Sequence, residues 1–196
     1  SFQGKLKTGE LPVTAQKLLD HASLPSADVI RRINKYSNNL MARQLLLTIA
    51  AERSGVPATV EGARKAISDW LLSKRLDMPE LVLENGSGLS RIERISARHL
   101  GELLLAAYAS PVMPELMSSL PVLSVDGTVK KRQTDSQFQG RAHLKTGSLD
   151  GVSALAGYML DEKGRRWVIV FMANHPRAAF SRQAQDALLE WVYRHE

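Results

Sequence analysis

The sequence RAHLKTGSLDGV, residues 141–152, combines a strand with a turn. Its first part, AHLKTG, is a strand-like run, and the SLDG that follows is typical of a turn between antiparallel strands. Two more strand-like runs come after it, SALAGYML at residues 153–160 and RWVIVFMAN at residues 166–174, with the turn DEKGR between them. The sequence therefore predicts an antiparallel meander of three strands.

Helical patterns flank this meander in the sequence. Apolar residues recur at helical spacing in five segments, four before the meander and one after it: residues 26–36, 40–53, 59–76, 96–110 and 180–195. Trp70 and Trp191 are expected to face inward from two of these helices. A short strand over residues 81–83, followed by the permissive loop Asn-Gly-Ser-Gly, is expected between the third and fourth helices. We therefore expect an α+β domain with helix, antiparallel sheet and helix layers.

Composition limits the classes of function. The 196 residues, 44% of them hydrophobic, suit one domain or one domain and part of a second, and no apolar run is long enough to span a membrane. A net charge of +6 admits a nucleic-acid partner, but the positive residues are scattered and aromatic residues are only 6%, so we expect none. The sequence has no cysteine for thiol catalysis and no histidine spacing typical of metal ligands, so neither a metal nor a cofactor is expected.

The tripeptide Lys-Thr-Gly occurs twice, at residues 7–9 and at residues 145–147, in different surroundings. Pro12 follows the first copy closely and has no amide hydrogen to donate, which limits that segment to an edge or a turn. We assign the copy at Lys7 no role. The second copy precedes the hairpin turn and is therefore expected on the sheet.

The second copy has the chemistry of a carboxylate-binding strand. Gly147 leaves the strand edge without a side chain, so an extended ligand backbone can lie against it as an added strand. Lys145 offers a positive charge to a carboxylate, and the Thr146 hydroxyl offers a directional hydrogen bond. The alternative interpretation is an ordinary solvated strand end.

A second polar group, Ser37-Asn38-Asn39, stands between the first two predicted helices. In one interpretation Ser37 is only the N-cap of the following helix, which contributes about 1 kcal/mol. In the other, Ser37 carries protons and the Asn39 amide holds a substrate carbonyl, because an amide donates and accepts hydrogen bonds without taking up charge.

Ser-x-Asn followed by Lys-Thr-Gly on a strand resembles the second and third motifs of the serine penicillin-recognising enzymes. The stretches INKYSNNLMARQLL, ENGSGLSRIERISA and HLKTGSLDGVSALAGY together resemble the class C low-molecular-weight penicillin-binding proteins, which are D-alanyl-D-alanine carboxypeptidases/endopeptidases of the peptidase S13 type. The resemblance implies a serine β-lactamase/DD-peptidase transpeptidase-like fold and a periplasmic location. It also implies two kinds of partner, peptidoglycan stem peptides ending in D-Ala-D-Ala and β-lactams.

The resemblance implies roles for the residues that match its motifs. Ser37 would relay protons, and Asn39 would orient the substrate and the lysine of the first motif. Asn38, between them, is an aspartate in many relatives, but Asn39 is the position whose amide matters.

The third motif carries the substrate-binding roles. Lys145 is expected to act in catalysis and, with Thr146, to bind the terminal carboxylate of the stem peptide or the β-lactam. Gly147 and Ser148 are expected among the substrate-binding residues, the backbone amide of Ser148 forming half of the oxyanion hole.

The first motif of these enzymes, Ser-x-x-Lys, carries the nucleophile, and no lysine of the sequence has a serine three residues before it. The nearest imitation is Thr14-Ala15-Gln16-Lys17. In this family the nucleophile comes from an N-terminal segment that precedes a large insertion, and SFQGKLKTGELP resembles the segment that re-enters the catalytic domain. Residues 1–196 are thus expected to form the C-terminal portion of that domain, without the Ser-x-x-Lys segment and the inserted domains, and to be inactive alone.

Two further interpretations stay open, a non-catalytic peptidoglycan-binding or interaction module with the same fold and a basic nucleic-acid-binding domain. The missing N-terminal part of the same protein is an additional expected partner.

Overall fold

The computed structural model of the chain describes residues 8–10, 12–132 and 136–195. Its sheet is the antiparallel meander that the sequence predicts, with the spatial order first, second, third. The three strands are β1 (Ala142–Leu149), β2 (Val152–Leu160) and β3 (Arg166–Asn174). Lys145 in β1 stands opposite Ala156 in β2, which stands opposite Val170 in β3.

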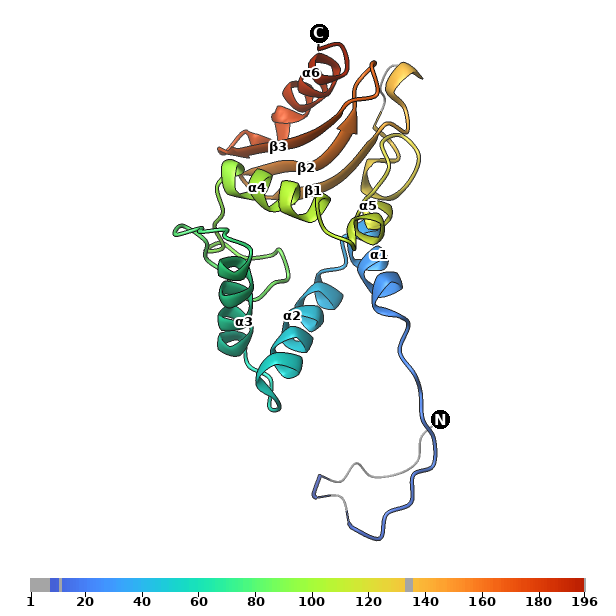
Figure 1. Cartoon of the computed structure of the whole chain (residues 1–196), viewed down its shortest axis with the longest axis vertical. Helices are drawn as coiled ribbons and strands as arrows, with labels where there is room; N and C mark the ends of the chain where they lie inside the picture. Colours follow the sequence, from blue (N-terminus) through green and yellow to red (C-terminus); the bar gives the residue numbers. More distant parts are fainter. Residues whose placement is uncertain (1–7, 11, 133–135, 196) are drawn as a thin grey trace.

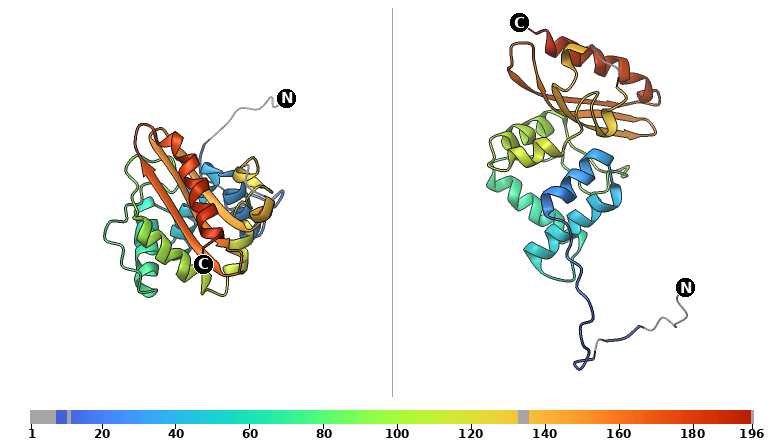
Figure 2. Two further views of the ribbon diagram at one scale, coloured as in Figure 1. Left: turned by 90° about the horizontal axis from the view of Figure 1, so that it is seen from above. Right: turned by 90° about the vertical axis from the view of Figure 1, so that its right-hand side faces the viewer.

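The helices surround this sheet in two layers. Those of the described residues are α1 (Ser26–Tyr36), α2 (Asn39–Ser54), α3 (Val60–Ser73), α4 (Ala97–Tyr108), α5 (Met113–Ser119) and α6 (Arg182–Tyr193). Helix α6 covers one face of the sheet, while α4 and α5 lie at the other face and α2 and α3 lie beyond them (Figures 1 and 2). The expected helix, antiparallel sheet and helix layers are confirmed.

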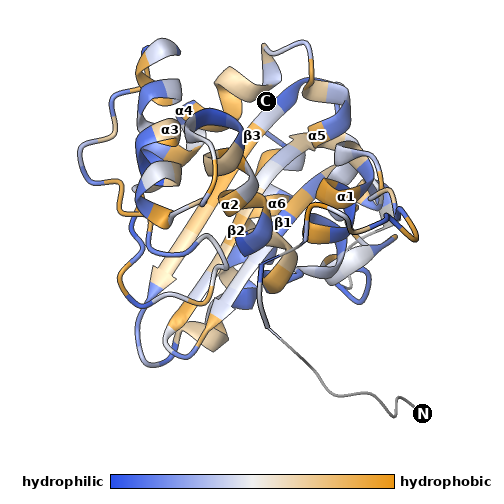
Figure 3. Cartoon of the chain, turned by 90° about the horizontal axis from the view of Figure 1, so that it is seen from below, coloured by the Kyte–Doolittle hydropathy of each residue, from blue (hydrophilic) through white to orange (hydrophobic). Residues whose placement is uncertain are grey.

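The main hydrophobic core lies between α6 and the sheet, and Figure 3 shows hydrophobic positions recurring along β2 and β3. Its buried members are Leu123, Val129, Phe138, Ala142, Leu144, Leu155, Met159, Ile169, Leu189, Val192 and Tyr193. The helical part has smaller cores, one of which joins α2 to α3 through Leu46, Ala50 and Ala63. The largest share of buried apolar surface therefore supports the strands that carry the second Lys-Thr-Gly copy.

Two expectations about local structure are wrong, and one helix was missed. The segment at residues 81–83 forms no strand but a single antiparallel bridge between Val82 and Arg94. The two tryptophans expected to face inward, Trp70 and Trp191, are 42% and 59% exposed, because the apolar stripe of each helix is narrower than the sequence pattern indicates. Helix α5 was not predicted, since its seven residues are too few for a helical period to show.

The segment before α1 contains neither helix nor strand over its described residues, and it extends away from the body of the molecule (Figure 1). The first Lys-Thr-Gly copy falls here. Thr8 and Gly9 are exposed and outside any strand, and Lys7 lies outside the described residues. Over residues 8–10, 12–132 and 136–195, no helix combines the length and the apolar character needed to cross a bilayer.

Candidate active site

Ser37 lies at the turn between α1 and α2 in a left-handed backbone conformation, with φ 52° and ψ 50°. This conformation is uncommon for a residue other than glycine and is found where the surroundings enforce it, often at functional sites. The serine is the C-cap of α1 and not the N-cap of α2, so the capping interpretation of Ser37 is wrong. The N-cap is Asn38, whose side-chain oxygen accepts a hydrogen bond from Met41 N–H at 3.0 Å.

The Ser37 hydroxyl oxygen accepts a hydrogen bond from Lys145 Nζ at 2.9 Å, across a sequence separation of 108 residues. This contact brings together the two motifs that the sequence indicates. Because the lysine donates, the Ser37 hydroxyl keeps its own hydrogen for another acceptor.

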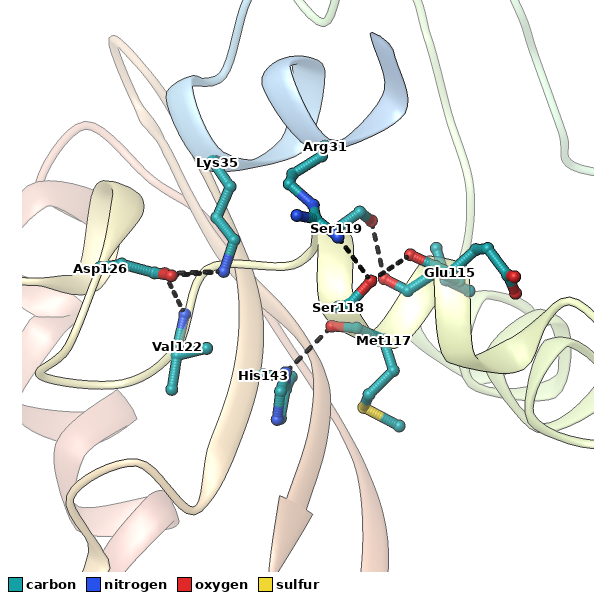
Figure 4. Close-up of polar contacts among 10 residues, drawn as sticks. Arg31, Lys35, Glu115, Met117, Ser118, Ser119, Val122, Asp126 and His143 are labelled. Atoms are coloured by element: carbon teal, nitrogen blue, oxygen red, sulfur yellow. Dashed lines mark hydrogen bonds and ion pairs between the residues drawn. The ribbon is translucent and has the colours of Figure 1, made fainter. Parts of the chain in front are cut away.

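Helix α1 is held against α5 and the loop that follows it by charged and polar contacts, which Figure 4 shows. Lys35 Nζ donates to both carboxylate oxygens of Asp126, at 2.8 and 2.6 Å, and the Lys35 side chain is only 12% exposed. Asp126 also accepts a hydrogen bond from Val122 N–H at 2.7 Å, and Arg31 donates to Ser118 at 3.4 Å. These contacts fix the end of α1, and with it the Ser37 turn, to the segment that runs into β1.

The carboxyl group of Asp126 responds to two opposed effects. Partial burial raises its pKa, but the hydrogen bonds from Lys35 and Val122 and the charge of Lys35 outweigh burial and lower the pKa below its ordinary range. The Asp126 carboxyl that faces Lys35 is therefore ionised at neutral pH.

Lys145 lies in β1, whose residues 145–149 pair with β2 on one side only among the described parts of the chain. Besides Ser37, its Nζ donates to the Thr146 carbonyl at 2.7 Å. An ammonium has three donors, so one stays available for a ligand carboxylate. Burial lowers the pKa of Lys145, because removal from water disfavours the charged form.

The rest of the second copy lies along the same open edge. The Thr146 hydroxyl is 2.8 Å from the hydroxyl of Thr128, in the short 3₁₀ helix Gly127–Val129, and either hydroxyl can donate in this pair. Gly147 and Ser148 are exposed. A Cβ at Gly147 would sit 3.4 Å from Ala154 Cβ, an ordinary contact, so packing inside the protein does not require the glycine.

Asn39 is the first residue of α2, and its amide is anchored on the loop between α3 and α4. Its Nδ2 donates to the Ser87 carbonyl at 2.5 Å. A carbonyl oxygen only accepts, so this bond determines which end of the amide is nitrogen and turns Oδ1 away from the loop. Asn39 Oδ1 has no hydrogen-bond partner within residues 8–10, 12–132 and 136–195.

Sequence reasoning missed four residues that support this site: Thr128, Asp126, Ser87 and Glu93. The last two belong to ENGSGLSRIERISA, which was singled out as a family stretch without roles for its members. The tight Asn-Gly-Ser-Gly turn was a usable signal for Ser87. No sequence signal marked Asp126 or Thr128, because their contacts join segments far apart in the chain.

The chain is similar to several known proteins. The sequence profile of the D-Ala-D-Ala carboxypeptidase 3 (S13) family matches residues 1–195. The D-alanyl-D-alanine carboxypeptidase of Actinomadura sp. is 32% identical over 172 residues, which are 84% of this chain and 32% of that protein. Carboxypeptidase DacB of Mycolicibacterium smegmatis is 34% identical over 173 residues, which are 85% of this chain and 37% of that protein. The chain thus spans about a third of the length of these relatives.

The fold has known counterparts as well. The crystal structure of penicillin binding protein 4 (dacB) from Haemophilus influenzae superposes with a TM-score of 0.71 at 26% identity, covering 83% of this chain and 39% of that chain. The same protein complexed with a β-lactam gives a TM-score of 0.70 at 25% identity, covering 83% of this chain and 41% of that chain. The expected DD-peptidase fold is confirmed, and the chain belongs to the D-Ala-D-Ala carboxypeptidase 3 (S13) family.

Proposed function

We propose that the protein is a serine-type D-Ala-D-Ala carboxypeptidase/endopeptidase that cleaves peptidoglycan stem peptides in the periplasm through an acyl-enzyme and is a target of β-lactams. The observation that carries the proposal is the 2.9 Å hydrogen bond from Lys145 Nζ to Ser37 Oγ, because it joins the carboxylate-binding strand to a serine able to move a proton. Membership of the S13 family supports the same reaction class.

In this proposal the open edge of β1 binds the substrate backbone and its terminal carboxylate. Lys145 uses its remaining donor for the carboxylate, and the Thr146 hydroxyl donates a second hydrogen bond while Thr128 donates to it. Gly147 leaves the edge bare for an added strand, and the exposed Ser148 supplies a backbone N–H to the oxyanion that develops on the attacked carbonyl.

The residues of the α1–α2 turn handle the proton and the amide. Ser37 receives a hydrogen bond from Lys145 and donates its own hydrogen, so it can pass a proton to the departing amine. Asn39, fixed by Ser87, presents Oδ1 and its second N–H to the substrate or to a neighbouring lysine.

The nucleophile in this proposal is a serine followed three residues later by lysine, supplied by a preceding segment of the same protein or by a second polypeptide. Its oxygen attacks the carbonyl carbon of the penultimate D-alanine, the C–N bond breaks, and the terminal D-alanine leaves as the amine after protonation through Ser37. Water then hydrolyses the ester. Two facts support an outside nucleophile: no lysine of the sequence has a serine at that spacing, and the matched part of the chain covers only 32% and 37% of the two relatives.

The test is intact mass spectrometry after incubation with a β-lactam. The 196-residue chain alone is expected to gain no covalent adduct, and a protein that also carries the Ser-x-x-Lys segment is expected to gain one. An adduct on the chain alone would contradict the outside nucleophile. A longer protein that binds stem peptide but is never acylated would favour the non-catalytic module.

A matched pair of lysine variants tests the assigned strand in the longer protein. Lys145→Met keeps the length of the side chain and removes the charge, so the acylation rate is expected to fall about 100-fold. Lys65→Met removes a lysine that is 74% exposed and, among the described residues, pairs only with Asp69 on its own helix, so the rate is expected to stay unchanged. Equal acylation rates for the two variants would show that Lys145 has no part in the reaction.

A further inference from the structure

We infer that Glu93 is a positioning residue that sets the orientation of the Asn39 amide through the loop at residues 84–88. Among the described residues, no hydrogen bond or ion pair joins Glu93 to Asn39. Its influence passes through backbone groups, and its meaning for the reaction rests on the proposed function above.

The first step is the set of hydrogen bonds that Glu93 accepts from the loop. One of its carboxylate oxygens, Oε1, accepts hydrogen bonds from three successive backbone N–H groups, those of Glu84 at 3.2 Å, Asn85 at 3.1 Å and Gly86 at 3.0 Å. Three adjacent N–H groups that converge on one oxygen form an anion-binding nest, and a carboxylate is a stronger acceptor for them than a neutral group. The three backbone N–H groups immediately before Ser87 therefore share one acceptor, the Glu93 carboxylate.

The second step is the position of the loop on α2. Gly86 has φ +67°, and a Cβ there would stand 2.9 Å from the Leu46 side chain, so the loop backbone lies directly on the helix that carries Asn39. Asn85 Oδ1 accepts a hydrogen bond from Ser87 N–H at 2.8 Å, which closes the turn. The Ser87 carbonyl is consequently held where Asn39 Nδ2 can donate to it at 2.5 Å.

The third step is the consequence for Asn39. A primary amide can turn end for end at little cost in packing, and only its hydrogen bonds decide which end faces which partner. With the Ser87 carbonyl in place, the nitrogen must face the loop and Oδ1 must face away from it. If the carbonyl moves, both orientations of the Asn39 amide become accessible.

Arg64, on α3, also contacts the loop, at its beginning. Arg64 donates to the carbonyls of Leu83 at 2.5 Å and Glu84 at 3.3 Å. Neither contact reaches Gly86 or Ser87. Glu93 is thus the side chain whose removal is expected to release the carbonyl that orients Asn39.

The test is NMR of the Asn39 side-chain amide in the 196-residue chain, with its signals assigned from their disappearance in Asn39→Ser. In the unsubstituted protein, one Nδ2 proton is bonded to Ser87 and the other is not, so the two signals are expected to be well separated. Glu93→Ala is expected to bring them together toward the positions of a free amide. Glu93→Gln keeps an acceptor oxygen at the same place and is expected to restore most of the separation.

Glu80→Ala is the matched control. Glu80 also accepts a backbone hydrogen bond, from Ser96 N–H at 2.9 Å, and contacts His99 Nδ1 at 2.6 Å, but none of these groups touches Ser87. It is expected to lower stability and leave the Asn39 signals unchanged. Unchanged Asn39 signals in Glu93→Ala would overturn the inference. If Glu93→Ala does not fold, Glu93→Asp decides, because its shorter side chain withdraws the oxygen: reduced separation supports the inference and full separation overturns it.

The role in the reaction is measured in the longer protein that carries Ser-x-x-Lys. Glu93→Ala is expected to slow acylation by a β-lactam about 10- to 100-fold, with rescue by Glu93→Gln. Normal acylation in Glu93→Ala would overturn this role. If even the unsubstituted protein is not acylated, the proposed function fails, while the NMR result on Asn39 still decides whether Glu93 positions the amide.

Discussion

The two halves of the molecule hold their candidate catalytic residues in different ways. In the sheet half, formed by β1–β3 and α6, Lys145 and Ser148 belong to a continuous antiparallel ladder backed by the main core. In the helical half, formed by α1–α5, Ser37 and Asn39 each rest on one side-chain hydrogen bond to a distant segment. Such a bond contributes about 1 kcal/mol, whereas a ladder combines many bonds. We therefore expect backbone changes to damage the sheet half and single polar changes to displace residues of the helical half.

The largest effect is expected from a backbone change in the sheet half. Gly157 lies in β2 where β1 passes so close that an added Cβ would overlap the carbonyl oxygen of His143. Gly157→Ala must separate the two strands, so we expect the free energy of unfolding to fall by at least about 3 kcal/mol. Urea denaturation followed by circular dichroism measures the loss.

The control for this change is a glycine in the helical half. A Cβ at Gly101 in α4 would meet Val170 Cγ2 at 3.9 Å, an ordinary contact, and alanine favours a helix over glycine by about 0.5–1 kcal/mol. Gly101→Ala is thus expected to stabilise the protein slightly. A Gly157→Ala variant as stable as Gly101→Ala would contradict the close approach of β1 and β2.

A smaller effect is expected from two carboxyl groups, one in each half. Asp161 is fully buried at the β2–β3 turn, and hydrogen bonds from Trp167 and Arg165 outweigh the opposing effect of burial and lower its pKa to about 2. Hydrogen bonds from Ser96 and His99 lower the pKa of Glu80 in the helical half to about 2 as well. The Glu80 side chain is 34% exposed, so water can replace part of what it loses.

We expect Asp161→Asn to reduce stability more than Glu80→Gln at neutral pH. Both pKa values are depressed in the folded state, so each carboxylate stabilises the protein above its ordinary pKa, and that contribution is lost as the pH falls from about 4 to about 2. The difference between each variant and the unsubstituted protein should therefore shrink in acid. Urea titrations over a series of pH values measure this difference in stability. If it does not change with pH, ionisation of Asp161 and Glu80 does not contribute to stability.

The contact between the halves at Lys35 and Asp126 is expected to contribute less. Asp126→Asn keeps the acceptor for Val122 N–H but leaves the mostly buried Lys35 ammonium without an ionised partner, so we expect a loss of about 1 kcal/mol. Asp69→Asn breaks an exposed pair on α3 and is expected to change stability hardly at all. Equal effects in urea titrations would mean that the Lys35 contact is as solvated as the Lys65 one.

The smallest expected change is a gain in stability and not a loss. Burial lowers the pKa of Lys145 in the folded protein, so its charged form opposes folding below that pKa and the opposition is relieved as the pH rises toward the ordinary value near 10.5. Lys145→Met is therefore expected to be slightly more stable than the unsubstituted protein at neutral pH, with the advantage fading in alkali. A loss of stability would show that the contact with Ser37 outweighs desolvation.

Much of the fold and half of the site were predictable, for reasons that particular residues illustrate. The Asp-Gly turn after Lys145 marks a hairpin locally, so the strands followed from neighbouring residues. The pairing of Ser-x-Asn with Lys-Thr-Gly followed from motif recognition, and the 2.9 Å contact between Ser37 and Lys145 agrees with it. The buried face of α6 was harder, since Trp191 extends the apolar stripe without entering the core.

Local patterns predict the three-stranded meander, the α+β class and the residues of the two motifs, because strand, turn and motif signals lie within a few neighbouring positions. Three other features are seen only in the folded chain. Ser37 has a left-handed backbone and caps the C-terminus of α1, Asp126 pairs with Lys35, and the loop that Glu93 binds presents the Ser87 carbonyl to Asn39. These features depend on hydrogen bonds between segments far apart in the chain. A pattern of neighbouring residues does not show which distant segment they will contact.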